Sequence, residues 1–200
     1  MNAPRPLLLG CGILRREVRL LCERHGWTFE RRWLSPALHG RPLQLDRSLS
    51  LALAAHADRD VVVMYGCCSL QMDALVNRPG VRRMDRQNCL SMLLGEDEFA
   101  REVQAGAYFL LEEWTADWAE QLRQAFGTRD LDLVREIFRS DREYLLALRT
   151  PCSGDYALAA RAAAETIGLP LRWRDCGLEH LERALREAFD ASPPLARSAS

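Results

Sequence analysis

Short runs of apolar residues alternate with longer amphipathic stretches along the whole chain. The apolar runs are continuous, as at 61–65, which reads Val-Val-Val-Met-Tyr. Continuous runs are typical of parallel strands buried on both faces, and the amphipathic stretches have the spacing of helices that cover such a sheet. The pattern predicts an α/β protein with a Rossmann-like or flavodoxin-like, mostly parallel sheet and helices on both faces.

The limits of the elements follow from turn residues and from changes of hydrophobic period. Strands are expected at 7–10, 27–34, 61–65, 81–84, 108–111, 144–148 and 169–173, and helices at 12–25, 43–57, 70–76, from 89 onward, 115–126, 130–139, 155–167 and 178–189. The run at 61–65 is expected at the centre of the sheet. We expect one domain over 1–190, with a boundary near 105–130 if it forms two small lobes, and a disordered tail at 191–200.

Composition and charge exclude several classes of partner and enzyme. The 200 residues carry 27 basic and 28 acidic side chains, so the chain as a whole has no net attraction for nucleic acid. No apolar run approaches the ~20 residues of a membrane span. Every basic residue other than histidine is arginine, which excludes a Schiff-base lysine, a P-loop lysine and a pyridoxal phosphate anchor.

Seven cysteines are present, and the N-terminus lacks the long apolar core of a signal peptide. We therefore expect a cytoplasmic protein whose thiols stay reduced and serve as core residues, ligands or nucleophiles rather than as a disulfide framework.

Six of the seven cysteines lie just after an expected strand or at the start of the next helix. They are Cys11, Cys67, Cys68, Cys89, Cys152 and Cys176. Ligands of open α/β sheets bind outside the carboxyl ends of the strands, and nearby helix N-termini favour the thiolate form, so these thiols are candidates for one shared site. The alternative for each is packing as a small apolar residue, which we expect for Cys22 on the apolar face of the first helix.

The spacing of the cysteines narrows the kind of metal site. No C-x-x-C pair of a zinc finger or ribbon is present, and the close runs of a ferredoxin are absent. A zinc ion or an iron–sulfur cluster held from distant loops remains open, and three thiolates would leave a fourth position for substrate.

A few residues near the cysteines are candidates for binding or catalysis. Gly10 and Gly12 resemble part of a phosphate-binding turn, although the third glycine of the dinucleotide fingerprint is replaced by Arg15. His39 follows the second strand and is a candidate ligand, acid or base, and Arg41 beside it could bind a carboxylate or phosphate. A plain loop histidine is the alternative.

Five short motifs lie between residues 10 and 114, within a resemblance that spans about residues 7–190. They are Gly-Cys-Gly-Ile-Leu-x-x-Glu-Val at 10–18, Leu-His-x-Arg-Pro at 38–42, Tyr-Gly-x-Cys at 65–68, Asn-Cys-Leu-x-x-Leu-Leu-Gly at 88–95 and the Tyr-to-Trp segment at 108–114. In combination they resemble the uncharacterised prokaryotic DUF family 1638.

The resemblance implies that Cys11, Cys68 and Cys89 are the cysteines of the family, with Cys67, Cys152 and Cys176 as less certain members of the site. Tyr65 and Gly66, which open the third motif, join Gly10 and Gly12 as candidate cofactor-binding residues.

Two positions depart from the usual family pattern. Gln87-Asn88 replaces a His-Asp pair, which puts a proton-transfer role there in doubt, and Ser69 replaces a glycine. Relatives occur near corrinoid-dependent methyl-transfer systems, so corrinoid or methyl-transfer proteins and a small-molecule substrate are the partners that the resemblance implies.

Three functions follow as hypotheses. The first is a metal-binding protein that holds an iron–sulfur cluster or zinc through Cys11, Cys68 and Cys89, with a redox or methyl-transfer role and with His39 and Arg41 facing the open position. The second is a metal-free cysteine-dependent enzyme, racemase-like or with other thiol chemistry, and the third is a non-catalytic small-molecule binding protein.

Overall fold

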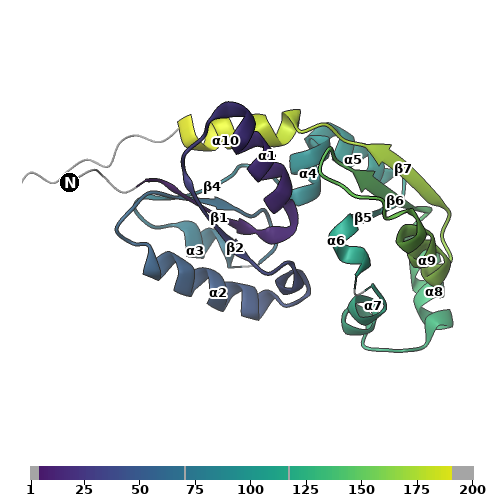
Figure 1. Cartoon of the computed structure of the whole chain (residues 1–200). Coiled ribbons are helices and arrows are strands. Elements are labelled where there is room, and N and C mark those ends of the chain that lie inside the picture. Colours follow the sequence, from purple (N-terminus) through teal and green to yellow (C-terminus); the bar gives the residue numbers. More distant parts are fainter. Residues whose placement is uncertain (1–4, 70, 117, 191–200) are drawn as a thin grey trace, which may run out of the picture. The chain divides into compact units, whose positions relative to one another are not determined.

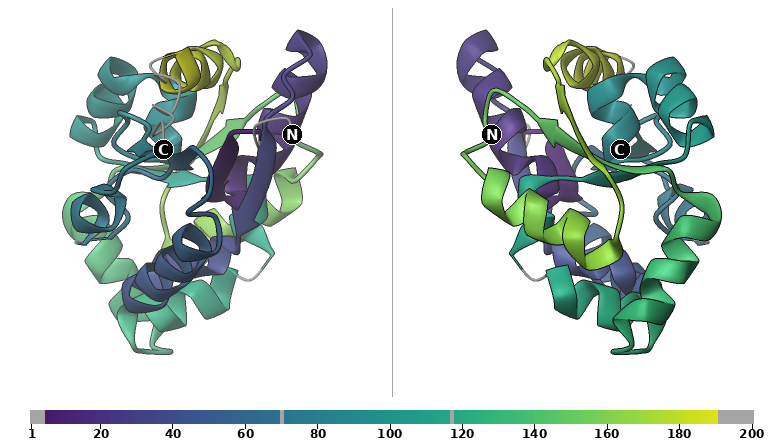
Figure 2. Two further views of the ribbon diagram at one scale, coloured as in Figure 1. Left: turned by 90° about the vertical axis from the view of Figure 1, so that its left-hand side faces the viewer. Right: turned by 90° about the vertical axis from the view of Figure 1, so that its right-hand side faces the viewer.

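The computed structural model describes residues 5–69, 71–116 and 118–190, which form two compact units (Figure 1). The first unit contains the residues up to Met92 and those from Glu179 on, and the second unit is Leu93–Leu178. The boundary expected near 105–130 lies inside the second unit, and the tail expected at 191–200 lies outside the described residues. The colours in Figures 1 and 2 trace the chain from the first unit into the second and back to the first, where it ends with α10 (Glu179–Asp190).

The first unit contains a four-stranded parallel sheet with the strand order β2-β1-β3-β4. Its strands are β1 (Leu7–Cys11), β2 (Glu30–Leu34), β3 (Val61–Met64) and β4 (Val81–Arg83). Its helices are η1 (Gly12–Leu14), α1 (Arg15–His25), η2 (Pro36–Gly40), α2 (Pro42–Ala55), α3 (Met72–Val76) and α10 (Glu179–Asp190), and α4 (Cys89–Leu94) begins in it. The apolar run of β3 is in the interior of the sheet, as predicted.

One face of this sheet packs against α2 and α3. Leucines spaced four residues apart bring one side of α2 onto the sheet. The buried cluster consists of Leu7, Leu9, Leu45, Leu49, Leu53, Val61, Val63, Tyr65 and Met72. Because successive side chains of a strand point to opposite faces, the odd-numbered positions of β1 and β3 share this core.

The strand expected at 27–34 begins three residues later, because the preceding aromatic residues pack onto helices. Trp27 stacks on His25 at the end of α1, with ring centroids 5.0 Å apart, and Phe29 stacks on Phe189 of α10 at 4.3 Å. Glu182 of α10 also lies 3.1 Å from His25, Oε2 to Nε2. These contacts join α10 to α1, and Figure 1 shows the two helices side by side.

The second unit contains a three-stranded parallel sheet with the order β5-β6-β7. The strands are β5 (Ala107–Leu110), β6 (Tyr144–Arg149) and β7 (Leu171–Asp175), and the helices are α5 (Glu96–Gln104), α6 (Glu112–Thr115), α7 (Trp118–Phe126), α8 (Leu131–Asp141) and α9 (Ala157–Ile167).

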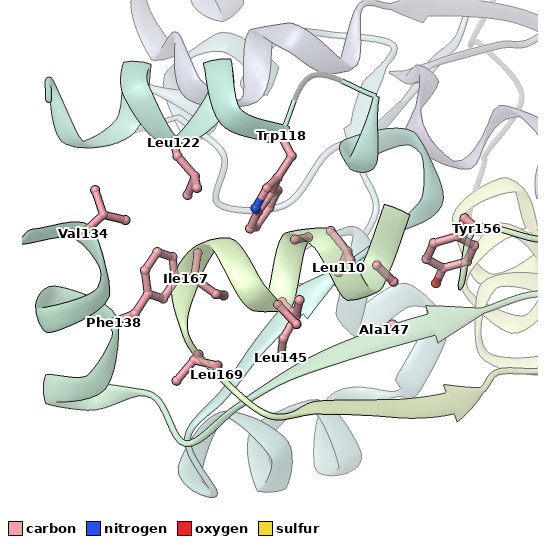
Figure 3. Close-up of a cluster of buried hydrophobic side chains, with 13 residues drawn as sticks. Leu110, Trp118, Leu122, Val134, Phe138, Leu145, Ala147, Tyr156, Ile167 and Leu169 are labelled. Atoms are coloured by element: carbon pink, nitrogen blue, oxygen red, sulfur yellow. The ribbon is translucent and has the colours of Figure 1, made fainter. Parts of the chain in front are cut away.

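The core of the second unit forms around the alanine-rich α9 (Figure 3). Its buried face carries Ala160, Ala163 and Ala164, whose small side chains bring the helix close to the sheet. Leu145 of β6 is fully buried in the same cluster. Both units therefore have helices packed on a parallel sheet, which is the predicted α/β class.

Candidate functional site: a group of thiols at the first sheet

Four segments at the carboxyl edge of the first sheet carry polar or sulfur-containing side chains. Cys11 is the last residue of β1, and the segment from Tyr65 to Cys68 directly follows β3. His39 lies in η2, after β2, and Cys89 is the first residue of α4, beyond β4. Parallel strands end at the same edge of a sheet, so this edge collects residues that are far apart in sequence.

The strand register places Cys11 and Tyr65 on one face of the sheet. Leu9 pairs with Val63 and Gly10 with Met64, so Cys11 and Tyr65 are the next residues along the two neighbouring strands. Each extends the set of side chains that faces α2. Cys11 and Cys68 both pack against the apolar cluster to which Tyr65 belongs.

A close backbone contact brings Cys89 to this edge. The Cys67 N–H donates a hydrogen bond to the Gln87 carbonyl oxygen at 2.8 Å. A Cβ atom on Gly66 would lie only 1.9 Å from that oxygen, so the approach of the two segments requires glycine. The loop that carries Cys68 and the loop that precedes Cys89 are thereby held against each other.

The electrostatics of the site shows that the thiols act on one another. Burial raises the pKa of Cys89, and negative charge on Cys11 and Cys68 raises it further. Burial also raises the pKa of Cys68, with the backbone N–H of Gly66 acting in the opposite direction. Burial, followed by charge on the same thiols, raises the pKa of Tyr65. At neutral pH, Cys68 and Cys89 therefore hold their protons unless a cation offsets the charge.

The two adjacent cysteines differ in exposure. Cys67 is exposed, whereas Cys68 is half-buried and packs against the core cluster. Of this pair, Cys68 is the residue that joins Cys11 and Cys89.

Comparison with known protein families identifies the chain. The model of a family described as a protein of unknown function, DUF1638, matches residues 33–185, three quarters of the chain. The chain belongs to the DUF1638 family. No curated protein and no solved structure matches it. The matched range includes Cys68 and Cys89, whereas Cys11 precedes it.

Asn88 caps the N-terminus of α4. Its Oδ1 accepts hydrogen bonds from the N–H groups of Leu90 and Ser91, both at 2.9 Å. An aspartate can accept the same two bonds, so asparagine preserves the start of the helix that carries Cys89.

Ser69, the residue after Cys68, connects the loop to α2. Its hydroxyl donates a hydrogen bond to the Asp46 carboxylate and accepts one from the Gln71 N–H at 3.0 Å. A glycine could make neither bond through a side chain, so Ser69 provides a polar attachment to α2 beside Cys68.

The remaining candidates of the first unit lie around the same edge. His39 is exposed, yet enough protein surrounds its ring for burial to lower its pKa, which keeps it neutral at neutral pH. Arg41 is exposed and precedes α2. A Cβ on Gly10 would lie 3.0 Å from the Met64 Cβ, and one on Gly12 3.2 Å from the Leu34 carbonyl oxygen, so close packing accounts for both glycines.

The structure assigns the other cysteines to different places. Cys152 follows β6 and Cys176 follows β7, so both lie at the carboxyl edge of the second sheet. Cys152 donates its N–H to the Thr150 hydroxyl at 3.1 Å, and Cys176 donates its N–H to the Arg149 carbonyl at 2.7 Å. Cys22 is buried in α1, as predicted.

Cys176 is expected to react slowly with alkylating agents near neutral pH. Burial raises its pKa to about 11, so roughly one thiol in a thousand is ionised at pH 8. Peptide mapping after iodoacetamide treatment should show modification of the exposed Cys67 first, and a Cys176 rate that rises about tenfold per pH unit between 8 and 10. A Cys176 rate that is already independent of pH in this range would contradict the assignment.

The described part of the chain has neither a preformed metal-ligand group nor a membrane-spanning helix. Over 5–69, 71–116 and 118–190, no three or more His, Cys, Asp or Glu side chains form a group that could hold a metal ion as they are arranged in the structure. Within the same ranges, no helix has the length and apolar character to cross a membrane.

The sequence did not predict the Gln87 carbonyl as part of the site, whereas it did predict Tyr65 as a candidate cofactor-binding residue, without placing it beside Cys11. The Gln87 carbonyl has no signal in the sequence, because any residue carries one. The Tyr65 hydroxyl, in contrast, could have been placed beside Cys11 by aligning the carboxyl ends of the two strands.

Proposed function

We propose that the first unit is a metal-binding module that holds an iron–sulfur cluster or a zinc ion through Cys11, Cys68 and Cys89. The observation that supports this proposal is the convergence of Cys11, Cys68 and Cys89, from three separate segments, on one edge of the first sheet. We further propose that it acts in the cytoplasm, in redox chemistry or in association with corrinoid or methyl-transfer proteins.

The donor set fits such a metal in its chemistry. Thiolates are the preferred ligands of iron–sulfur clusters and are common ligands of zinc. Three half-buried thiolates close together repel each other, and a bound cation removes that repulsion and favours loss of their protons. A cluster would supply electron transfer and zinc a Lewis acid, and three protein ligands leave a position for a small-molecule substrate, with His39 and Arg41 at the same sheet edge.

The experiment is metal and acid-labile sulfide analysis, with absorption spectra, of protein purified without oxygen. The wild type should contain iron and sulfide, or zinc, at about one site per chain. Each of Cys11→Ser, Cys68→Ser and Cys89→Ser should lose most of it, because a serine hydroxyl is a poor ligand for these metals. Cys67→Ser is the matched control, since it changes an exposed thiol of the same loop, and it should keep its metal.

The proposal fails if the folded wild-type protein binds neither zinc nor a cluster, even after incubation with zinc or with iron and sulfide under reducing conditions. It also fails if the three serine variants bind as much metal as the Cys67→Ser control.

A metal-free cysteine enzyme is the second candidate, and the protonated state of the buried thiols favours it. A racemase-like mechanism needs one thiol as acid and one thiolate as base, and the raised pKa values of Cys68 and Cys89 suit the acid. This candidate predicts a single alkylation-sensitive cysteine and unchanged folding without metal.

A further inference from the structure

An open pocket lies at the amino end of the first sheet, at the start of β2. Its volume is about 570 Å³, which is within the range of small-molecule sites. The lining residues come from three segments of the first unit and include Arg5, Trp27, Phe29, Arg31, Arg32 and His56. The thiol group lies at the opposite, carboxyl edge of the same sheet, so this pocket is separate from the candidate site described above.

The pocket is strongly basic. Arg5, Arg31 and Arg32 are exposed, and over residues 5–69, 71–116 and 118–190 none of their guanidinium groups forms an ion pair. Glu30 is the one carboxylate among the described lining residues. Its Oε2 accepts a hydrogen bond from the Arg59 guanidinium at 2.6 Å, so its charge is offset. Three positive charges of the pocket are therefore left for a ligand.

Two aromatic side chains form a preformed apolar wall. Trp27 stacks on His25 of α1, and the guanidinium carbon of Arg186 lies 5.1 Å from the centroid of the Trp27 ring. Phe29 stacks on Phe189 of α10 at 4.3 Å. Because helices hold both rings in place, little side-chain entropy is lost when a ligand contacts them. An apolar wall beside the arginines favours an organic anion over a bare inorganic ion.

Protection of the sheet edge does not account for the whole arrangement. β2 is a short edge strand, and exposed charges such as Arg31 and Arg32 discourage its pairing with another chain. Arg5, however, precedes β1, and His56 follows α2, yet both line the same pocket. The Glu30 N–H donates toward β1, so the next N–H along the strand, that of Arg31, points to the open edge as a further donor.

We propose that this pocket binds an organic phosphate of about the size of a nucleoside diphosphate. Guanidinium groups match the oxygens of a phosphate group in pairs of parallel hydrogen bonds. A terminal phosphate carries about two negative charges and three acceptor oxygens, so it engages more than one arginine, whereas a single carboxylate would leave positive charge unpaired. The aromatic wall contacts the rest of the ligand. This binding does not depend on a metal at the thiol group.

The first test is calorimetric titration with ADP as the probe, at low ionic strength and with a chelator present. The wild type should bind ADP, and Arg31→Gln and Arg32→Gln should each weaken the affinity about tenfold, because each removes a charge-assisted hydrogen bond. Arg19→Gln is the matched control, since it removes an arginine of α1 whose side chain is 70% exposed, and its affinity should equal that of the wild type.

Two further probes separate the parts of the ligand. Adenosine lacks the phosphates and should show no binding at the concentrations that saturate the protein with ADP. Inorganic phosphate lacks the part that contacts Trp27 and Phe29, so it should bind about tenfold more weakly than ADP, or weaker still.

A second measurement locates the site in the wild type and so does not depend on the folding of any variant. In ¹H–¹⁵N spectra, ADP should shift the resonances of the Arg31 amide and the Trp27 indole, whereas the Trp173 indole of the second unit should not move.

The proposal is overturned if the wild type does not bind ADP, or if Arg31→Gln and Arg32→Gln bind it as tightly as Arg19→Gln. Shifts confined to residues outside the pocket would have the same meaning. Tighter binding of citrate, of an acidic peptide or of a single-stranded oligonucleotide than of ADP would also overturn the assignment to a small organic phosphate.

Discussion

Alanine at Gly66 will destabilise the first unit by about 2–3 kcal/mol or more, because the added methyl group cannot fit against the neighbouring backbone. The Cβ atom would lie 1.9 Å from the Gln87 carbonyl oxygen and 2.7 Å from the Asn88 nitrogen. Backbone atoms cannot swing aside like the end of a side chain, so the segment before Cys89 must move away from the loop that holds Cys68. Urea unfolding followed by circular dichroism measures the loss of stability.

The same variant should also disturb the thiol group. Separation of the two segments exposes Cys89, so its alkylation rate in the folded protein should rise severalfold. Gly40→Ala is the matched control, because a Cβ there meets nothing within 4 Å, and it should change stability by less than about 0.5 kcal/mol. Equal stability of the two variants would show that the contact between Gly66 and Gln87 does not hold these segments together.

Truncation of Leu145 to alanine should cost the second unit about 2–5 kcal/mol, because it leaves a cavity in the centre of the cluster around α9. Leu145 is 0% exposed and lies on the central strand of its sheet, whereas Leu158→Ala removes a side chain that is 82% exposed and should have little effect. Native-state hydrogen exchange can locate the effect, since the amides of β6 should lose protection. Metal analysis of the same variant should give the content found for the wild type. Loss of metal in Leu145→Ala to the extent seen in Cys68→Ser would contradict an independent first unit.

Much of the fold could be predicted from hydrophobic period, because four of the strands, β1, β3, β5 and β6, are largely buried and apolar. The run of β-branched residues in β3 strongly favours a strand. The leucines spaced four residues apart in α2 predict a helix with one buried face. Gly26, in the left-handed conformation with a φ of 64°, ends α1 where the sequence indicated.

The strand boundary that the sequence predicted wrongly depends on contacts between distant segments. The apolar and polar residues alternate from position 27, which predicted a strand that begins there. Trp27 and Phe29 instead pack on His25 of α1 and Phe189 of α10, and β2 begins at Glu30. A local period cannot distinguish these two uses of an aromatic residue.

The composition of the candidate site was only partly predictable, for a similar reason. The positions of the cysteines after strands could be predicted, but strand order cannot be obtained from local sequence. The structure gives two sheets rather than one, so Cys152 and Cys176 belong to a different unit from Cys11, Cys68 and Cys89.

The return of the chain to the first unit has a consequence for synthesis. The second unit is continuous in sequence, so all its residues are available once position 178 has left the ribosome. The first unit still lacks α10 at that stage, and with it the contacts of Phe189 on Phe29 and of Glu187 on Arg86, whose carboxylate and guanidinium lie 2.7 Å apart. The second unit is therefore expected to fold before the first unit is complete. A chain truncated before α10 should contain a folded second unit and a first unit that lacks one of its covering helices.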